Sequence, residues 1–260
     1  MTTAGFVCLM YHELELPGRA LCQSEPGYVR YVLAAQEFED QMQTIRDLGM
    51  KGVSVSEALN LSGPAVAITF DDGSETDLLA AAPALAKLGF RATFYVVAGK
   101  IGQPGYLSPA QLRALDSSGF EIGCHSMTHP YLPDLEQRGL HREIAEAKAL
   151  IEQMLGKRVE HFSCPGGRYD ARAIRLAKDA GFRTVATSEP RVNMMRTGMF
   201  LLGRVAITRG MQLSTFRQLC RGQALWKLGI SGTLRDGLKR LLGNKAYDQV
   251  RARILKKQPH

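Results

Sequence analysis

The sequence predicts an α/β chain whose first 210 residues fold as a (β/α) barrel of about seven parallel strands. Short apolar segments alternate there with amphipathic ones, joined by short links. This alternation is typical of parallel strands joined by crossover helices. Acidic residues and histidines directly follow several of the predicted strands, at the barrel end where enzymes of this class collect their chemistry. The last fifty residues predict a basic helical C-terminal extension.

Apolar runs predict the strands, and amphipathic runs predict the helices between them. The strands expected are 6–11, 53–55, 65–70, 92–97, 120–123, 161–163, 184–187 and 201–207. The helices expected are 35–48, 78–88, 108–119, 135–155 and 171–180. In the first helix Phe38, Met42 and Ile45 share one face, and Gly49 ends it. Residues 15–30 are rich in Pro, Gly and polar side chains and predict a loop.

Composition favours a chain with a substantial core and a cytoplasmic location. Hydrophobic residues make up 45% of the 260 residues, and no run of 18 apolar residues predicts a membrane-spanning helix. The first residues lack the basic and apolar regions of a secretory signal. The five cysteines form no Cys-x-x-Cys pair, which favours a reducing compartment over a disulfide scaffold.

Positive charge is concentrated at the C-terminus. Residues 211–260 hold eleven Lys/Arg against two Asp/Glu, a net +9, whereas residues 1–210 hold 22 against 23, a net −1. We therefore divide the chain into a domain at 1–210 and an extension at 211–260, with basic amphipathic helices at 234–242 and 247–255. Such helices either pack on the barrel with a solvated basic face or lie on an anionic membrane. Nucleic-acid binding is not expected, because aromatic residues do not alternate with the basic ones.

The pair Asp71-Asp72, followed by Gly73, ends the buried strand predicted at 65–70. Asp-Gly is a common turn pair, so one interpretation is a plain turn. Adjacent buried carboxylates repel each other, however, and require a cation or hydrogen-bond donors. A site in which one carboxylate binds a metal and the other acts as a base satisfies this requirement.

Two histidines four residues apart, His125 and His129, follow the strand predicted at 120–123. Pro130 disfavours a helix at His129, so either a helical turn or a tight loop brings the rings together. A satisfied loop pair is the alternative to metal ligation. Two histidines and one aspartate make a three-ligand set with an open position, which is typical of catalytic zinc, although other divalent metals also suit these ligands.

Three motifs in this order resemble those of the polysaccharide deacetylases, the carbohydrate esterase family 4 with the NodB homology domain. They are Thr69-Phe70-Asp71-Asp72-Gly73, His125-Ser126-x-x-His129-Pro130 and Pro165-x-Gly167, and the resemblance covers roughly residues 5–210. It implies a distorted (β/α) barrel that removes acetyl groups from sugars with a divalent metal, most commonly zinc. Asp72, His125 and His129 would bind the metal, and Asp71 would be the general base. Pro165, Gly166 and Gly167 would supply a backbone donor to the oxyanion.

The sequence departs from the family pattern at three places. Ser163 stands where the third motif has the arginine that orients the base, and Arg168 and Arg204 are the candidates to replace it. Gly166 stands where the family usually has an aromatic residue. The late Leu-x-His motif that supplies a general acid is absent, and Arg204-Val205-Ala206 occupies its place.

His12 is the candidate general acid, because it ends the first strand, which lies beside the last strand in a barrel. A Met-Tyr-His opening is also familiar in a subset of the family. The alternative is that His12 only hydrogen-bonds a loop. Cys124 and Cys164 flank the predicted site, and we interpret them as buried thiols rather than nucleophiles.

The sequence therefore predicts a cytoplasmic, metal-dependent hydrolase that removes an acetyl group from an N-acetylated sugar in glycan biosynthesis. The expected substrate is an acetylated glycan or lipid-linked sugar, with a peripheral membrane contact through residues 211–260. The alternative function is a catalytically impaired barrel that binds glycan without hydrolysing it. The absence of the motif arginine and the late histidine supports that alternative.

Overall fold

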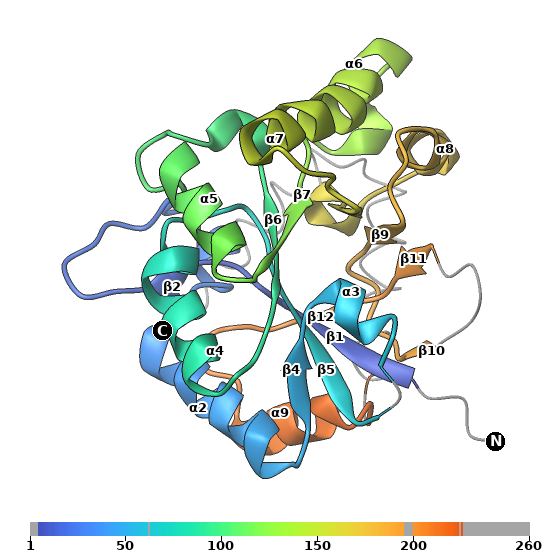
Figure 1. Cartoon of the computed structure of the whole chain (residues 1–260). Coiled ribbons are helices and arrows are strands. Elements are labelled where there is room, and N and C mark those ends of the chain that lie inside the picture. Colours follow the sequence, from blue (N-terminus) through green and yellow to red (C-terminus); the bar gives the residue numbers. More distant parts are fainter. Residues whose placement is uncertain (1–4, 62, 195–199, 224, 226–260) are drawn as a thin grey trace.

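The computed structural model describes residues 5–61, 63–194, 200–223 and 225. Ten strands form one main sheet, which curls into a nearly closed barrel surrounded by helices (Figure 1). Along the sheet the strands follow the order β10-β1-β5-β6-β7-β8-β9-β11, with β12 paired to β1 and β4 to β5. All the pairings in this sheet are parallel except β1 with β10. The predicted (β/α) barrel is therefore confirmed.

Most strands lie where the apolar runs predict them. Their bounds are β1 Gly5–Tyr11, β4 Lys51–Val53, β5 Ala65–Phe70, β6 Thr93–Val96, β7 Glu121–Cys124, β8 His161–Ser163, β9 Thr184–Ala186, β10 Asn193–Met194, β11 Leu201–Leu202 and β12 Val205–Ala206. A separate pair, β2 Leu14–Glu15 and β3 Leu33–Ala34, brackets the predicted loop. The strand predicted at 53–55 is two residues too late, because Ser54 caps a short helix, α3 Val55–Ala58.

The last predicted strand, 201–207, is wrong as a continuous element. It is interrupted at Gly203 and Arg204, so that β11 pairs with β9 while β12 pairs with β1. The side chain of Asn193 holds this crossing, donating to the Gly203 carbonyl and accepting from its N–H, both at 2.8 Å. The interruption lies where the two ends of the barrel meet, and it carries Arg204 into the interior, where it is fully buried.

Helices cover the outside of the barrel. They are α1 Pro26–Val29, α2 Ala35–Asp47, α4 Ala82–Lys87, α5 Pro109–Ser117, α6 Gln137–His141, α7 Ala147–Leu155, α8 Ala171–Asp179 and α9 Leu213–Cys220. Two π-helical turns, η1 Asp77–Ala81 and η4 Arg142–Glu146, lead into α4 and α7, so the helix predicted at 135–155 is continuous but wider at its centre. Short 3₁₀ turns are η2 Ala98–Lys100, η3 Leu132–Asp134 and η5 Pro165–Gly167.

A chain of aromatic rings connects the core across neighbouring strands. Tyr11 stacks on Phe70 at 5.3 Å between ring centroids, and Phe70 stacks on Phe94 at 5.1 Å. Phe38 of α2 meets both Tyr11 and Phe70 edge-on. Each such pair contributes about 0.5–1.5 kcal/mol beyond the area that it buries. These contacts fix β1, β5 and β6 against α2 and thereby fix the loops that follow the three strands.

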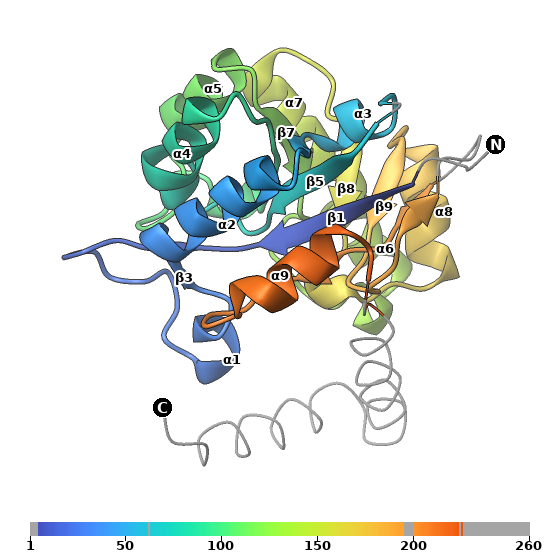
Figure 2. The same cartoon turned by 90° about the horizontal axis from the view of Figure 1, so that it is seen from below.

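The chain beyond residue 210 begins with α9, which lies beside α2 (Figure 2). Phe216 and Leu219 of α9 are buried in the main core cluster, so this helix packs as part of the barrel. The boundary at 210/211 stays a prediction, and the helices predicted at 234–242 and 247–255 lie outside the described residues.

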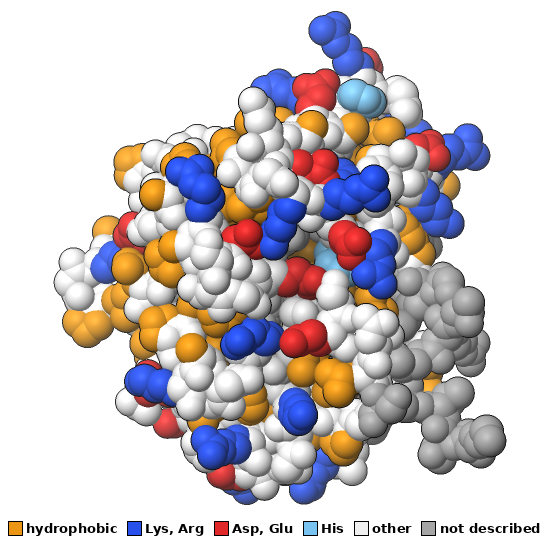
Figure 3. Space-filling model, viewed as in Figure 1, with side chains coloured by type: hydrophobic (Ala, Val, Ile, Leu, Met, Phe, Trp, Pro, Cys, Tyr) orange, Lys and Arg blue, Asp and Glu red, His pale blue; other side chains and the backbone are white. Residues whose placement is uncertain are grey.

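The face shown in Figure 3 carries interspersed positive and negative side chains, in keeping with the near-zero net charge of residues 1–210. Among the described residues, no helix is both long enough and apolar enough to cross a membrane.

Candidate metal and catalytic site

The loops after β1, β5, β7 and β8 bring the predicted site residues to one end of the barrel. His12 follows β1, Asp71 and Asp72 follow β5, and His125 follows β7. The strands are parallel, so their C-terminal ends meet at the same rim. The N–H of Asp71 donates to the Tyr11 carbonyl at 3.0 Å, which places His12 immediately beyond the point where β1 and β5 part.

Asp72, His125 and His129 converge on one point. One ligand atom from each lies within 4.8 Å of the others. The Nε2 atom of His129 is 3.4 Å from Oδ1 of Asp72, and Nε2 of His125 is 3.7 Å from the same oxygen. Among the described residues, these three side chains form the group of histidines, cysteines and carboxylates that has the spacing of a metal site. The donor set fits a divalent cation.

His125 is prepared to act as a ligand through Nε2. Its Nδ1 atom donates to the carbonyl oxygen of Ser163 at 2.8 Å, which leaves the Nε2 lone pair directed at the cluster. The ring is buried, and burial lowers the pKa of His125 to about 4 against the opposing charge of Asp71. The imidazole is therefore neutral near pH 7, as metal ligation requires.

The ligand loops hold unusual backbone conformations. Among the described residues, the non-glycine positions with positive φ are Asp72 at 79°, Ser126 at 68° and His129 at 66°. Such conformations cost about 1–3 kcal/mol each and persist where the surrounding structure enforces them. Two of these three residues are candidate ligands, and the third separates the two histidines. The strain is therefore concentrated in the loops that shape the cluster.

Glu143 holds the histidine loop from outside. It is buried on η4, and its carboxylate accepts from the N–H groups of Met127 and Thr128 at 2.9 and 2.8 Å and from the Thr128 hydroxyl at 2.8 Å. The Ser126 hydroxyl also accepts from the His129 N–H at 2.9 Å. The sequence did not point to Glu143, because the amphipathic pattern of the helix predicted at 135–155 does not distinguish one of its polar residues from another.

Asp71 is held by Arg204 in a fully buried, two-pronged ion pair. Nη1 and Nη2 of Arg204 each donate to a different oxygen of Asp71 at 2.7 Å. Burial by itself raises the pKa of Asp71, but the charge of Arg204 and the neighbouring His125 hold that pKa well below its usual range. Asp71 is therefore ionised at all ordinary pH values, with its oxygens fixed in direction.

The guanidinium of Arg204 is anchored on every side. Its Nη2 donates to the Ser163 hydroxyl at 2.7 Å, its Nη1 to the Thr69 hydroxyl at 3.2 Å, and its Nε to the Thr187 carbonyl at 3.0 Å. Ser163 in turn donates to Asp71 at 3.2 Å. A serine at the position of the family's motif arginine thus leaves room for an arginine that comes from the segment between β11 and β12.

Of the two arginine candidates, the structure brings Arg204 to Asp71 and places Arg168 elsewhere. The guanidinium carbon of Arg168 lies 3.7 Å from the ring centroid of Tyr131. In the sequence, Arg168 follows the strand predicted at 161–163 and Arg204 lies inside the strand predicted at 201–207, and neither position indicates which guanidinium reaches Asp71.

His12 directly follows Tyr11, whose carbonyl accepts from the Asp71 N–H at 3.0 Å. Burial lowers the pKa of His12, and the charges of Asp72 and Asp71 oppose that shift, so the ring is within reach of their fields. Its ring packs on that of Tyr31 at 5.0 Å, and its buried Nδ1 atom has no hydrogen-bond partner within the described residues. A buried imidazole nitrogen without a partner is available to a ligand.

The turn at Pro165–Gly167 offers one backbone donor. Pro165 has no N–H, and Gly167 donates its own to the Cys164 carbonyl at 2.8 Å. Of the three predicted residues, Gly166 therefore has the N–H that suits an oxyanion. Burial raises the pKa of Cys124 to about 12, and that of Cys164 also lies far above its usual range, so both flanking thiols are inert.

A nearly closed (β/α) barrel with an Asp-His-His cluster beside a fixed carboxylate has the construction of a barrel hydrolase. The polysaccharide deacetylase family model matches residues 58–185. A Bacillus subtilis protein named as a polysaccharide deacetylase, YxkH, is 30% identical over 188 residues, which cover 70% of this chain and 67% of the relative. The chain belongs to the polysaccharide deacetylase family.

Two further comparisons agree in fold and sequence. The peptidoglycan-N-acetylglucosamine deacetylase of Bacillus cereus is 32% identical over 124 residues, which cover 47% of this chain and 56% of that protein. The match thus spans little more than half of that relative. The Streptococcus pyogenes deacetylase PplD, solved in complex with acetate, superposes with a TM-score of 0.74 at 21% identity, covering 84% of this chain and 99% of that one. At this identity the likeness supports the fold.

Proposed function

We propose that this chain is a metal-dependent deacetylase that hydrolyses the N-acetyl group of a sugar within a glycan. The observation that carries the proposal is that Asp71, which is ionised and held in place by Arg204, lies next to the cluster of Asp72, His125 and His129. Nε2 of His125 lies 3.7 Å from both Asp71 and Asp72, so the two groups share one small space. The family membership and the names of the relatives support the same reaction.

Asp72, His125 and His129 would hold the metal, for which we propose zinc. A divalent ion there would lower the pKa of a water to near 7 and polarise the acetyl carbonyl. Asp71 would accept the proton of the attacking water, with the direction of its free lone pairs set by Arg204. The Gly166 N–H would donate to the carbonyl oxygen as negative charge develops on it.

His12 would protonate the leaving nitrogen. The amine must gain a proton as the C–N bond breaks, and a positioned histidine typically contributes 10²–10⁴-fold to such a step. The Nδ1 atom of His12 has no partner among the described residues; burial lowers the pKa of His12, and the charges of Asp72 and Asp71 oppose that shift. In this arrangement His12, which follows the first strand, replaces the histidine of the absent late motif as the general acid.

Acetate release from N-acetylglucosamine oligomers and from peptidoglycan fragments tests this function. We expect release that is lost on chelation and regained on adding zinc. Full metal occupancy with no acetate from any glycan would support the alternative of a glycan-binding barrel. The substitution Arg175→Ala, on the outer surface of α8, is the control for unspecific loss.

The cytoplasmic location, the lipid-linked substrate and the membrane contact of residues 211–260 stay predictions from the sequence. Flotation with anionic liposomes, using the full chain and a chain ending at residue 225, tests the membrane contact. Equal recovery of the two chains would contradict it.

A further inference from the structure

Tyr131 occupies the space that a side chain at position 166 would need. Gly166 is exposed and has a φ of 60°, and a Cβ built on it would lie 2.8 Å from Cε1 of Tyr131. A side chain at position 166 would therefore be excluded by the tyrosine as well as by the backbone. The loops that follow β7 and β8 meet at this contact, where an aromatic ring from the first lies against Gly166 of the second.

The ring of Tyr131 is fixed by Arg168. The guanidinium carbon lies 3.7 Å from the ring centroid, which is the distance of a close face-to-face cation–π contact. Both side chains are half-buried. A tyrosine held in this way loses little freedom when a ligand packs on it, because its ring is already immobilised.

The covalent neighbours of this pair connect it to the candidate site. Tyr131 follows His129 by two residues, and Gly166 follows Ser163 by three. His129 belongs to the Asp72 cluster, and the carbonyl of Ser163 accepts from the ring of His125. Short chain segments therefore join Tyr131 and Gly166 to residues of the candidate site, and Tyr131 contacts the turn that carries the Gly166 N–H.

We propose that Tyr131 is a substrate-contacting residue that sets specificity for oligosaccharides, and that Arg168 is its positioning residue. The inference rests on the proposed deacetylase function. The face of a sugar ring presents C–H groups, which pack on a flat aromatic surface, while its hydroxyls stay at the edge for polar partners. A ring at the rim, next to the reacting centre, contacts the sugar that neighbours the acetylated one. A monosaccharide lacks that second sugar and gains nothing from Tyr131.

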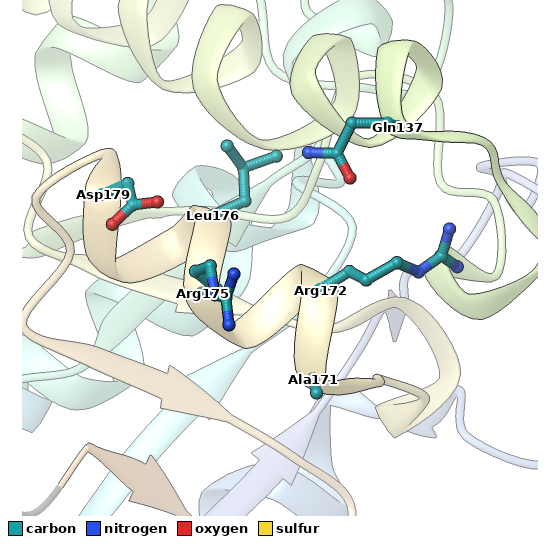
Figure 4. A pocket seen from close by; sticks show the side chains of 6 residues that line it. All are labelled: Gln137, Ala171, Arg172, Arg175, Leu176 and Asp179. Atoms are coloured by element: carbon teal, nitrogen blue, oxygen red, sulfur yellow. The ribbon is translucent and has the colours of Figure 1, made fainter.

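The test compares N-acetylglucosamine with its tetramer as substrates of the zinc-loaded full chain. For Tyr131→Ala we expect KM on the tetramer to rise about tenfold with kcat within about twofold, because the contact is equal in ground and transition states. Tyr131→Phe keeps the ring and should behave as wild type. Arg168→Ala should show the same KM effect in weaker form. Arg175→Ala removes an arginine that lines a separate surface pocket between α6 and α8 and should change nothing (Figure 4).

Binding of both sugars to variants in the Asp71→Asn background separates this inference from the proposed function. Tetramer binding that weakens about tenfold with Tyr131→Ala, without acetate release by the wild type, would overturn the deacetylase function and keep the stacking surface. If Tyr131→Ala changes neither acetate release nor the affinity for the tetramer, the inference is overturned. Equal losses on monomer and tetramer would also overturn it, because they indicate a local structural defect.

Discussion

The substitution Arg204→Met removes the charge that Asp71 faces while keeping most of the side-chain volume. Arg204 is fully buried and Asp71 is 3% exposed, and two 2.7 Å hydrogen bonds join them. Removing one partner of a buried ion pair leaves an unpaired charge and costs about 3–5 kcal/mol of folding free energy. The exposed pair of Arg183 with Glu160 has the same 2.7 Å distance, yet both side chains are more than 40% exposed. Arg183→Met should cost less than about 1 kcal/mol.

The cost should depend on pH in a defined direction. In the wild type the pKa of Asp71 is depressed, so its contribution is present above the unfolded value near 4 and is lost as pH falls towards the folded value. Without Arg204, burial remains as the main influence and raises the pKa of Asp71 above the unfolded value. The variant then loses stability as pH rises from about 4 towards 7, so the gap between the two proteins widens over that range.

Urea unfolding at pH 4.5 and pH 7 measures both effects. A gap of less than about 1 kcal/mol at pH 7, equal to that of Arg183→Met, would refute the buried-pair argument. If Arg204→Met does not fold at pH 7, the double variant with Asp71→Asn should recover stability, since it carries no unpaired charge. A double variant less stable than Arg204→Met would also contradict the argument.

Three other changes probe the surroundings of the cluster. Glu143→Ala leaves the N–H groups of Met127 and Thr128 without an acceptor and should weaken zinc binding at least tenfold in chelator competition. Glu146→Ala, at an exposed position on η4, should leave the affinity unchanged. Equal zinc affinities of the two variants would contradict the role of Glu143 in holding the histidine loop. His12→Gln should lower kcat by about 10²–10⁴-fold with full metal content, and an unchanged kcat would exclude His12 as the acid. Glu13 is fully buried and forms an ion pair with Arg19, so Glu13→Ala should cost about 3 kcal/mol in urea unfolding; a cost under about 1 kcal/mol would show that this ion pair contributes little to stability.

The barrel could be predicted because each strand and helix has its own local signal. β5 begins and ends where the apolar run at 65–70 does, and β8 has the bounds of the strand predicted at 161–163. The segment 201–207 could not be predicted in the same way, since it is apolar on both sides of Gly203 and Arg204 and local patterning gives no reason for a change of partner strand. That change depends on barrel closure, which is set by contacts far apart in the sequence.

The cluster of Asp72, His125 and His129 could be proposed from motifs because Asp72 and His125 lie just after strands and His129 follows His125 by four residues. The partner of Asp71 could not be chosen, because the choice between Arg168 and Arg204 depends on which guanidinium enters the barrel. Glu143 gave no signal at all. A carboxylate that accepts backbone N–H groups of a distant loop resembles any other polar residue of an amphipathic helix.

The most direct test of the account is acetate release by zinc-loaded Asp71→Asn, compared with Asp72→Asn. In the proposed mechanism Asp71 accepts a proton and the adjacent Asp72 binds the metal. This mechanism predicts that Asp71→Asn keeps one zinc per chain and loses acetate release by about 10²-fold or more, whereas Asp72→Asn loses the zinc itself. Acetate release by zinc-loaded Asp71→Asn at the wild-type rate would contradict the account.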